Sequence, residues 1–366
     1  MMTFSDADCA HMARALALAA RAQYSAHPNP MVGCVIVQGD AVVGEGWHER
    51  TGEPHAEINA LLVAGERAAG ATAFVTLEPC AHHGRTPPCA AALIDAGVAR
   101  VVAAMQDPYP EVAGRGLDML RAAGIVVEQG LMQSAAEALN AAYLLRVTRS
   151  RPLVRVKVAA SIDGAIAMQS GESQWITGPE ARDDVQRQRA RCGAIMTGIG
   201  TVLADDPSLN VRLESLQPGA RQPLRVVLDS GLRMSRGARM LTVPGQTLVC
   251  CAGSPPSDSL ESAGAEVRSF GAPGEKVDVS AVLSELAGRG VNAVLVEAGP
   301  ELTGHLLEQG LVDELVIYQA PHIMGSQTRT MFQTPSWLTL ADRRELDVSD
   351  VRRIGADTRI TARVLS

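Results

Sequence analysis

The stretch Thr76–Cys89, "TLEPCAHHGRTPPC", decides how the first half of the chain is interpreted, because two cysteines and two histidines lie within it. It continues an apolar strand pattern, "AFVTL", and its last residues open "PCAAALIDAG", which starts with proline and ends with glycine as helices often do. Upstream, "PHAEINAL" places His55 and Glu57 at the start of a helical pattern. These segments predict a metal site near one strand and two helices.

The residue types match those that zinc deaminases use, namely His-x-Glu followed by Pro-Cys and a second cysteine. His55, Cys80 and Cys89 would hold one zinc ion and leave a fourth position for water, whose pKa the metal lowers. Glu57 would not bind the metal; it would move a proton from water to the ring nitrogen and then to the leaving amine. This pattern therefore favours a catalytic zinc site.

Two other interpretations of the stretch are open. The usual signature is Pro-Cys-x-x-Cys, whereas eight residues, "AHHGRTPP", separate the two cysteines here. A closed zinc clip would add His82 or His83 to the three ligands, and a chance cluster would bind no metal. As single residues, both histidines are expected to be loop residues near the site rather than ligands.

Composition narrows the class of protein. The 366 residues favour two domains, and 46% hydrophobic with 20% charged residues is ordinary for a globular protein. The net charge of −7 argues against a large nucleic-acid surface, and we expect no nucleic-acid or membrane partner. Seven cysteines and no basic leader predict a reduced, cytoplasmic protein. Outside the metal motif, we expect the cysteines to be buried: Cys9, Cys34, Cys192, Cys250 and Cys251.

Alternating strand and helix patterns predict two layered α/β domains. The polar break "TRSRPL" at 148–153 separates them, so we expect a domain at 1–149 and another at 150–366. In the first, strands are expected at 32–37, 41–47, 73–77, 100–105 and 125–130, and helices at 6–24, 55–69, 88–97, 114–124 and 133–148. In the second, strands are expected at 153–163, 194–200, 224–230, 247–253, 292–299 and 314–321, helices at 178–193, 279–290 and 300–310, and a surface loop at 252–267.

Several motifs in order carry a resemblance to a known family. The first half contains "NPMVGCVI", "HAEINAL", "EPCAHHGRTPPC" and "VAGRG", and the second contains "KVAASIDGAIA", "GESQWITG", "GTVLADDPSLNVR" and "LVEAGPELTG". With this arrangement the chain resembles the RibD family of bifunctional riboflavin biosynthesis proteins across nearly its whole length. The resemblance implies an N-terminal cytidine-deaminase-like α/β/α domain followed by a dihydrofolate-reductase-like α/β domain.

The resemblance also implies two consecutive reactions. The first is zinc-dependent removal of the 2-amino group of 2,5-diamino-6-(5-phosphoribosylamino)pyrimidin-4(3H)-one. The second is NADPH-dependent reduction of the ribosyl group to a ribityl chain. For the first reaction, Asn29, His48 and Asp107 would line the substrate pocket; the family often has asparagine where this chain has Tyr109. Reductase domains of this kind are similar to dimeric folds, so we expect a homodimer.

For the second reaction, the resemblance implies two sets of contacts in the C-terminal half. The cofactor would contact Ala159, Trp175, Thr201, Asp205, Gly299, Pro300, Glu301, Leu302, Thr303, Gly304 and His305. The substrate would contact Ser173, Arg189, Leu209, Arg212 and Glu297, with the arginines suited to its phosphate. From its place on the first strand, Lys157 could also reach the sugar or phosphate.

The residues themselves, without the family, suggest four interpretations for the C-terminal half. The turn at Gly299 also ends a predicted strand and starts a helix, which suits an anion. Asp205 is a candidate for proton delivery, and Asp163 is expected to organise a turn. Read without the family, Arg189 would lie on a solvated helix face.

Two other functions compete with a bifunctional enzyme. One is a monofunctional nucleobase or tRNA deaminase whose C-terminal half is a binding module. The other is a zinc-stabilised nucleotide-binding protein with no activity. The acidic net charge and the long cysteine spacing disfavour tRNA.

Overall fold

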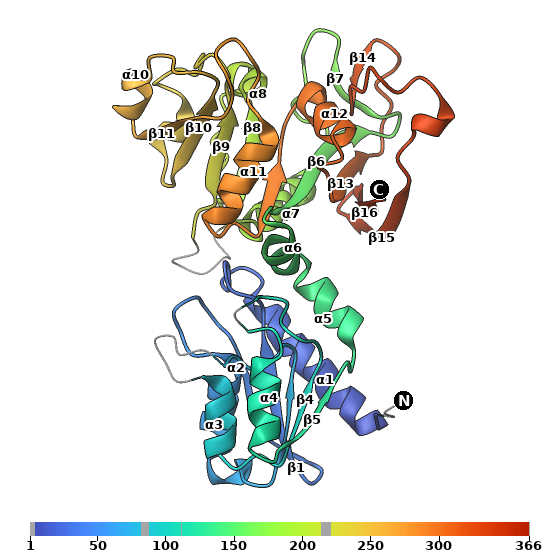
Figure 1. Ribbon diagram of the computed structural model, residues 1–366. Coiled ribbons are helices and arrows are strands. Elements are labelled where there is room, and N and C mark those ends of the chain that lie inside the picture. The colour runs from blue at the N-terminus through green and yellow to red at the C-terminus, as the bar shows by residue number, and fades with distance from the viewer. Residues whose placement is uncertain (1–3, 82–87, 111, 214–220, 366) are drawn as a thin grey trace. The chain divides into compact units, whose positions relative to one another are not determined.

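The computed structural model describes residues 4–81, 88–110, 112–213 and 221–365, so that His82 and His83 lie outside the described residues. The chain divides into two compact units, Met1–Ser150 and Arg151–Ser366 (Figure 1). Within the described ranges, every helix is too short or too polar to cross a membrane.

The first unit is a five-stranded sheet between two helical layers. The strand order is β2-β1-β3-β4-β5; β1 is antiparallel to both neighbours, and β3, β4 and β5 are parallel. The strands are β1 (Gly33–Gln38), β2 (Ala41–Trp47), β3 (Thr72–Val75), β4 (Arg100–Ala103) and β5 (Val126–Gln129). The helices are α1 (Asp6–Ala19), α2 (Ala56–Ala64), α3 (Cys89–Asp95), α4 (Arg115–Ala122), α5 (Gln133–Leu139) and α6 (Ala141–Arg149), with 3-10 turns at Ala20–Ala22 and Gly65–Ala68.

Small residues let the helices lie close to this sheet. Apolar residues of α2, α3 and α4 pack on one face, and those of α1 and α5 pack on the other. A Cβ added to Gly46 of β2 would lie 2.4 Å from the carbonyl oxygen of Ala56, the first residue of α2. Only glycine allows this approach, which sets α2, and with it His55 and Glu57, against the sheet.

The helix expected at 133–148 is two helices, broken at Asn140. The Asn140 side chain accepts a hydrogen bond from the Met31 N–H at 2.8 Å and donates one to the Met31 carbonyl at 2.9 Å. Asn140 lies between the two helices at non-helical backbone angles, φ −105° and ψ 17°. A contact across the unit therefore breaks a continuous helical pattern.

The second unit is built on a nine-stranded sheet in the order β11-β10-β9-β8-β12-β6-β13-β16-β15. The strands from β11 to β13 are parallel, and β16 and β15 continue the sheet in antiparallel fashion. In chain order they are β6 (Leu153–Ser161), β8 (Ala194–Gly198), β9 (Leu224–Leu228), β10 (Thr247–Cys251), β11 (Ala265–Ser269), β12 (Ala293–Val296), β13 (Glu314–Ala320), β15 (Leu346–Ile354) and β16 (Asp357–Val364), and β7 (Ala165–Met168) pairs separately with β14 (Thr328–Thr330).

Helices cover both faces of this sheet. Apolar residues of α11 and α12 belong to one core cluster, and those of α8, α9 and α10 belong to another. The α7 helix packs on β13. Strands covered on both sides lack polar alternation, as in the fully buried β10. The helices are α7 (Pro179–Ala190), α8 (Ile199–Asp205), α9 (Arg239–Thr242), α10 (Asp258–Glu261), α11 (Val279–Gly288) and α12 (Pro300–Glu308), with a 3-10 turn at Leu340–Asp342.

Two expectations were wrong. The surface loop expected at 252–267 contains α10 and the first residues of β11, which pairs with β10 at the edge of the sheet. The serines and prolines of this segment are typical of loops, so the short edge strand that follows them was not predicted. Cys9 is exposed on α1, whereas the other four cysteines outside the metal motif are buried as expected.

Candidate functional site

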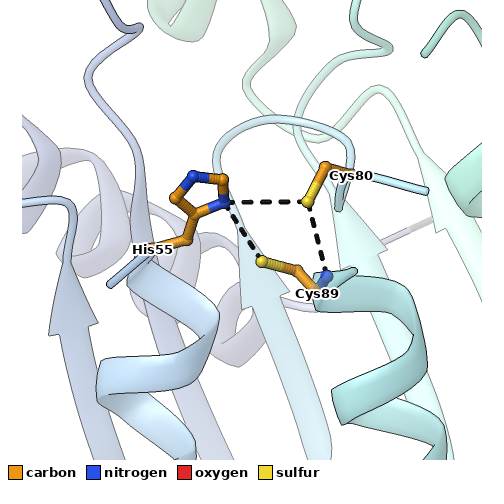
Figure 2. A group of neighbouring side chains, drawn as sticks. All are labelled: His55, Cys80 and Cys89. Carbon is orange, nitrogen blue, oxygen red and sulfur yellow. Dashed lines mark hydrogen bonds between the residues drawn. The ribbon is translucent and has the colours of Figure 1, made fainter. Parts of the chain in front are cut away.

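Three side chains of the predicted metal motif come together in the first unit (Figure 2). The ligand atoms of His55, Cys80 and Cys89 all lie within 4.8 Å of one another. His55 Nδ1 is 3.3 Å from Cys89 Sγ and 3.7 Å from Cys80 Sγ. Tetrahedral zinc with ordinary bond lengths separates a nitrogen and a sulfur ligand by about 3.6 Å. The donor set and its spacing therefore fit zinc, and no fourth protein ligand joins the cluster within the described residues.

Local structure brings each ligand to this point. His55 is the N-cap residue of α2, Cys89 is the first residue of α3, and Cys80 follows β3. The Cys89 backbone N–H donates to Cys80 Sγ at 3.4 Å (Figure 2). Hydrogen bonds with Cys89 and with His55 lower the pKa of Cys80 despite its burial. A thiolate is thus favoured at a helix start, where the positive end of the helix dipole lies.

Glu57 lies in the first turn of α2 and is 3% exposed. Burial, and next the charge on Cys80, raise the pKa of Glu57 to about 7. A glutamate beside the metal ligands, with a pKa near neutrality, can both accept and release a proton.

Two predicted substrate contacts lie beside the metal ligands. The His48 ring is 5.4 Å from the His55 ring, edge to face, and is 2% exposed. His48 Nδ1 is 3.2 Å from the Pro54 carbonyl oxygen, and its Nε2 is 3.0 Å from Asn29 Nδ2. Because a carbonyl only accepts, Nδ1 carries the proton and Nε2 accepts from the Asn29 amide. Burial lowers the pKa of His48, which keeps the ring neutral.

The third predicted contact, Asp107, is buried and held by tyrosines. Its carboxylate accepts from the Tyr109 backbone N–H at 2.9 Å and from the Tyr143 hydroxyl at 3.2 Å. The Tyr109 side chain itself is 36% exposed. Sequence reasoning missed Tyr143 and Asn140, because their partners are 36 and 109 residues away along the chain. No local pattern signals such contacts.

In the second unit, Glu297 follows β12 and meets two cations. Arg189 Nε donates to one carboxylate oxygen at 2.6 Å and Nη2 to the other at 3.0 Å, while Lys157 Nζ lies 3.7 Å from Glu297. Burial alone would raise the pKa of Glu297, but the charges of Arg189 and Lys157 outweigh it and lower the pKa to about 2. Arg189 is 8% exposed, so it does not lie on a solvated face.

Arg212 is exposed and bound by neighbours in its own segment. Its Nη1 donates to Asn210 Oδ1 at 2.8 Å and to the Ser208 hydroxyl. Partial desolvation of the guanidinium, and next the positive charge of Arg189, lower the pKa of Arg212. Of the other predicted substrate contacts, Leu209 is buried and Ser173 half-buried.

The predicted cofactor contacts gather at the carboxyl ends of three adjacent strands, where open α/β sheets bind ligands. Ala159 lies on β6, Thr201 and Asp205 lie on α8 directly after β8, and Gly299–His305 spans the start of α12 after β12. Gly299 is the N-cap of α12, and the N–H groups of such a first turn fit the phosphates of a nucleotide cofactor.

Three residues of this group differ in their surroundings. Thr303 is buried and donates to the Gly299 carbonyl, and a Cβ on Gly304 would lie 1.8 Å from the Gln333 carbonyl oxygen. Trp175 is 70% exposed. Asp163 lies in the turn after β6, where its carboxylate accepts from the Ser161 hydroxyl at 2.5 Å, and it also accepts from the N–H groups of Met324 and Gly325.

Comparison with known proteins decides the family. Residues 152–360 match the model for the RibD C-terminal domain, and residues 5–105 match the cytidine and deoxycytidylate deaminase zinc-binding region. The riboflavin biosynthesis protein RibD of Escherichia coli (strain K12) is 50% identical over 358 residues, covering 95% of this chain and 96% of the relative. The chain belongs to the RibD family.

Solved structures of the RibD family agree along the whole chain. The Acinetobacter baumannii RibD structure superposes with a TM-score of 0.91 at 43% identity, covering 98% of this chain and 99% of that one. A diaminohydroxyphosphoribosylaminopyrimidine deaminase/5-amino-6-(5-phosphoribosylamino)uracil reductase from Thermotoga maritima gives 0.86 at 30% identity, with the same coverage. This chain is thus a bifunctional riboflavin biosynthesis enzyme, a zinc-dependent deaminase and an NADPH-dependent reductase, with the fold that the resemblance implied.

Proposed function

We propose that Met1–Ser150 removes the 2-amino group of 2,5-diamino-6-(5-phosphoribosylamino)pyrimidin-4(3H)-one by hydrolysis, and that Arg151–Ser366 then reduces the ribosyl group to a ribityl chain with NADPH. One observation carries the first assignment: a His-Cys-Cys cluster at zinc-ligand spacing lies beside the buried carboxyl group of Glu57. The name of the Thermotoga relative supports the choice of substrates.

In the first reaction, His55, Cys80 and Cys89 would hold the zinc ion. When bound there, zinc supplies a strongly acidified water near neutral pH. Glu57 would accept one proton from the attacking water and give it to the ring nitrogen, and would then carry the remaining hydroxyl proton to the amino group, which leaves as ammonia. Its burial excludes bulk water, so the proton stays on the path between reactants.

Asn29, His48 and Asp107 orient the pyrimidine and ribose. The Asn29 amide offers both a donor and an acceptor, which suits the edge of a base. Neutral His48 fixes that amide, because its Nε2 accepts from Asn29 Nδ2 at 3.0 Å. Asp107 accepts hydrogen bonds from the substrate while Tyr143 and Tyr109 hold its carboxylate in place.

In the second reaction, phosphate binding falls chiefly to Arg212. Arg189 has a bidentate partner in Glu297, which uses the face of the guanidinium that would otherwise meet a phosphate. Glu297 and Lys157 contact the sugar, and Asp205 helps to deliver the proton. NADPH supplies the hydride when bound. The first turn of α12, after Gly299, holds its phosphates.

We further propose a cytoplasmic homodimer that binds no nucleic acid. Each described cysteine is a free thiol, which suits a compartment that keeps thiol ligands reduced. The dimer rests on the resemblance of the reductase domain to dimeric folds.

Mass spectrometry of the diaminopyrimidinone substrate after incubation with zinc-loaded protein, without nicotinamide, tests the first reaction. We expect the mass to change as one amino group becomes an oxo group, and addition of NADPH then to add two hydrogens. An unchanged mass with folded, zinc-loaded protein would contradict the proposal and favour a structural zinc clip. Zinc-free protein is the control for spontaneous hydrolysis.

A further inference from the structure

A second glutamate of the opening stretch, Glu78, is buried two residues before Cys80 and has no role in the chemistry described above. It is 4% exposed, and no Lys or Arg of the described residues forms an ion pair with it. A buried carboxylate needs compensating partners. Those partners show what Glu78 connects.

The Glu78 carboxylate accepts hydrogen bonds from four backbone N–H groups. Oε2 accepts from Asp107 at 3.2 Å and Gly114 at 2.9 Å, and Oε1 accepts from Gly116 at 2.9 Å and Leu117 at 3.4 Å. Three of these donors belong to the N-cap and first turn of α4, where backbone N–H groups lack helical partners and the dipole favours an anion.

Backbone packing joins the same segments independently. A Cβ added to Gly116 would lie 1.8 Å from the Pro79 carbonyl oxygen and 3.3 Å from Glu78 Oε1. The Glu78 backbone N–H also donates to the Met105 carbonyl at 3.0 Å. The metal loop, the segment after β4 and the start of α4 are therefore held together, with the Glu78 carboxylate at their centre.

This arrangement sets the distance between the metal ligands and Asp107. Cys80 lies two residues beyond Glu78 along the chain. The Asp107 backbone N–H donates to the Glu78 carboxylate, so Glu78 contacts the segment of Asp107 directly. Catalysis by positioning loses about 100-fold for a misplacement on the order of 1 Å. We propose that Glu78 is a positioning residue for deamination, which fixes Asp107 relative to the metal loop. This inference rests on the proposed deaminase function.

A double-mutant cycle on the full-length, zinc-loaded protein tests the proposal. Glu78→Gln keeps the size of the side chain but replaces one acceptor oxygen with an amide donor, which faces the N–H groups unfavourably. We expect kcat/KM for deamination to fall about 10- to 100-fold with zinc content unchanged. In the Asp107→Asn background we expect Glu78→Gln to lower kcat/KM less than about threefold, because the effects of coupled residues are not additive.

Three controls separate the outcomes. Glu66→Gln removes an exposed carboxylate of the same unit and should leave kcat/KM unchanged. Reduction of the deaminated intermediate should be equal in all variants. Glu78→Asp, which keeps the charge, replaces Glu78→Gln in the cycle if the latter loses zinc.

Equal losses in both Asp107 backgrounds, or unchanged deamination, would overturn the proposal. Loss of zinc from both Glu78 variants would also overturn it, since Glu78 would then act on the metal loop itself. An inactive wild-type protein would instead reject the deaminase function on which the inference rests.

Discussion

Glu57 in the first unit is buried and Glu297 in the second is half-buried, and burial disfavours the charge of both, yet their carboxyl pKa values shift in opposite directions. The pKa of Glu57 rises to about 7, because burial and a neighbouring thiolate disfavour its charge. The pKa of Glu297 falls to about 2, because Arg189 and Lys157 outweigh the cost of burial. Near neutral pH, the glutamate in the first unit can therefore gain and lose a proton, whereas the glutamate in the second unit remains an anion.

The difference follows from the chemistry that each unit must perform. Hydrolytic deamination needs a group that gains and loses a proton near neutral pH. In reduction, the cofactor carries the electrons, and the protein chiefly has to bind and orient. Glu297 suits the second task, since its bidentate contact fixes Arg189 in one geometry. The following experiments test this contrast, from the largest expected effect to the smallest.

Removal of zinc should produce the largest difference between the activities of the two units. We expect a chelator to abolish deamination, because the site then lacks the group that acidifies water. Reduction of the deaminated intermediate by NADPH should continue at its original rate. Parallel assays of both reactions, before and after zinc is restored, measure the effect. Equal loss of both activities would mean that zinc supports the whole chain rather than one reaction.

Glu57→Gln should lower the kcat of deamination by about 1,000-fold, within the usual range for loss of an acid–base group. The amide is similar in size but carries no titratable proton. Zinc content by metal analysis and the rate of reduction should match the wild type. If the variant also lost zinc, the proton-transfer role of Glu57 would have to be withdrawn.

Arg189→Ala should destabilise the second unit by about 3 kcal/mol, because the half-buried Glu297 carboxylate, whose side chain is 11% exposed, loses its bidentate partner and keeps Lys157 at 3.7 Å. Reduction should be lost with it, whereas deamination should persist. Chemical denaturation followed by a probe of the second unit measures the change. Arg187→Ala, an exposed position on the same helix, is the matched control and should stay within about 0.5 kcal/mol. Similar stabilities for the two variants would contradict the assignment.

Lowering the pH should reduce the stability of the second unit, because Glu297 becomes protonated. Its folded pKa of about 2 is below the ordinary value of 4.5, so its ionisation stabilises the fold above that value and the contribution is lost as the pH falls towards 2. Between about pH 5 and about pH 3 we expect the wild type to lose on the order of 1–2 kcal/mol more than Glu297→Gln. Denaturation curves at both pH values provide the comparison, and parallel pH dependence would refute the depressed pKa.

Arg212→Ala should have the smallest effect, about a tenfold rise in KM for the deaminated intermediate, or about 1.4 kcal/mol. Arg212 is exposed and its contacts are with its own segment, so stability should not change. Steady-state kinetics of the reductase measure this. An unchanged KM would move phosphate recognition away from Arg212 and back to Arg189.

The site was more predictable in the first unit than in the second. His55, Glu57, Cys80 and Cys89 lie within two short segments, and each follows a strand or starts a helix, so local patterns were enough to group them. Most other strands and helices were likewise predicted in both units, but no prediction covered β15 and β16. The edge strand β11 was missed, because a serine- and proline-rich segment precedes it.

The sequence by itself determined which residue types meet at the metal site and that two α/β units follow one another. Only the tertiary structure decided three contacts: Asn140 bonds to Met31 where the helix breaks, Glu78 accepts from the first turn of α4, and Arg189 donates to Glu297. The partners in the first and last of these contacts are more than 100 residues apart. Periodicity and capping patterns report on neighbours along the chain, whereas a buried polar group takes whichever partner the packed fold places beside it.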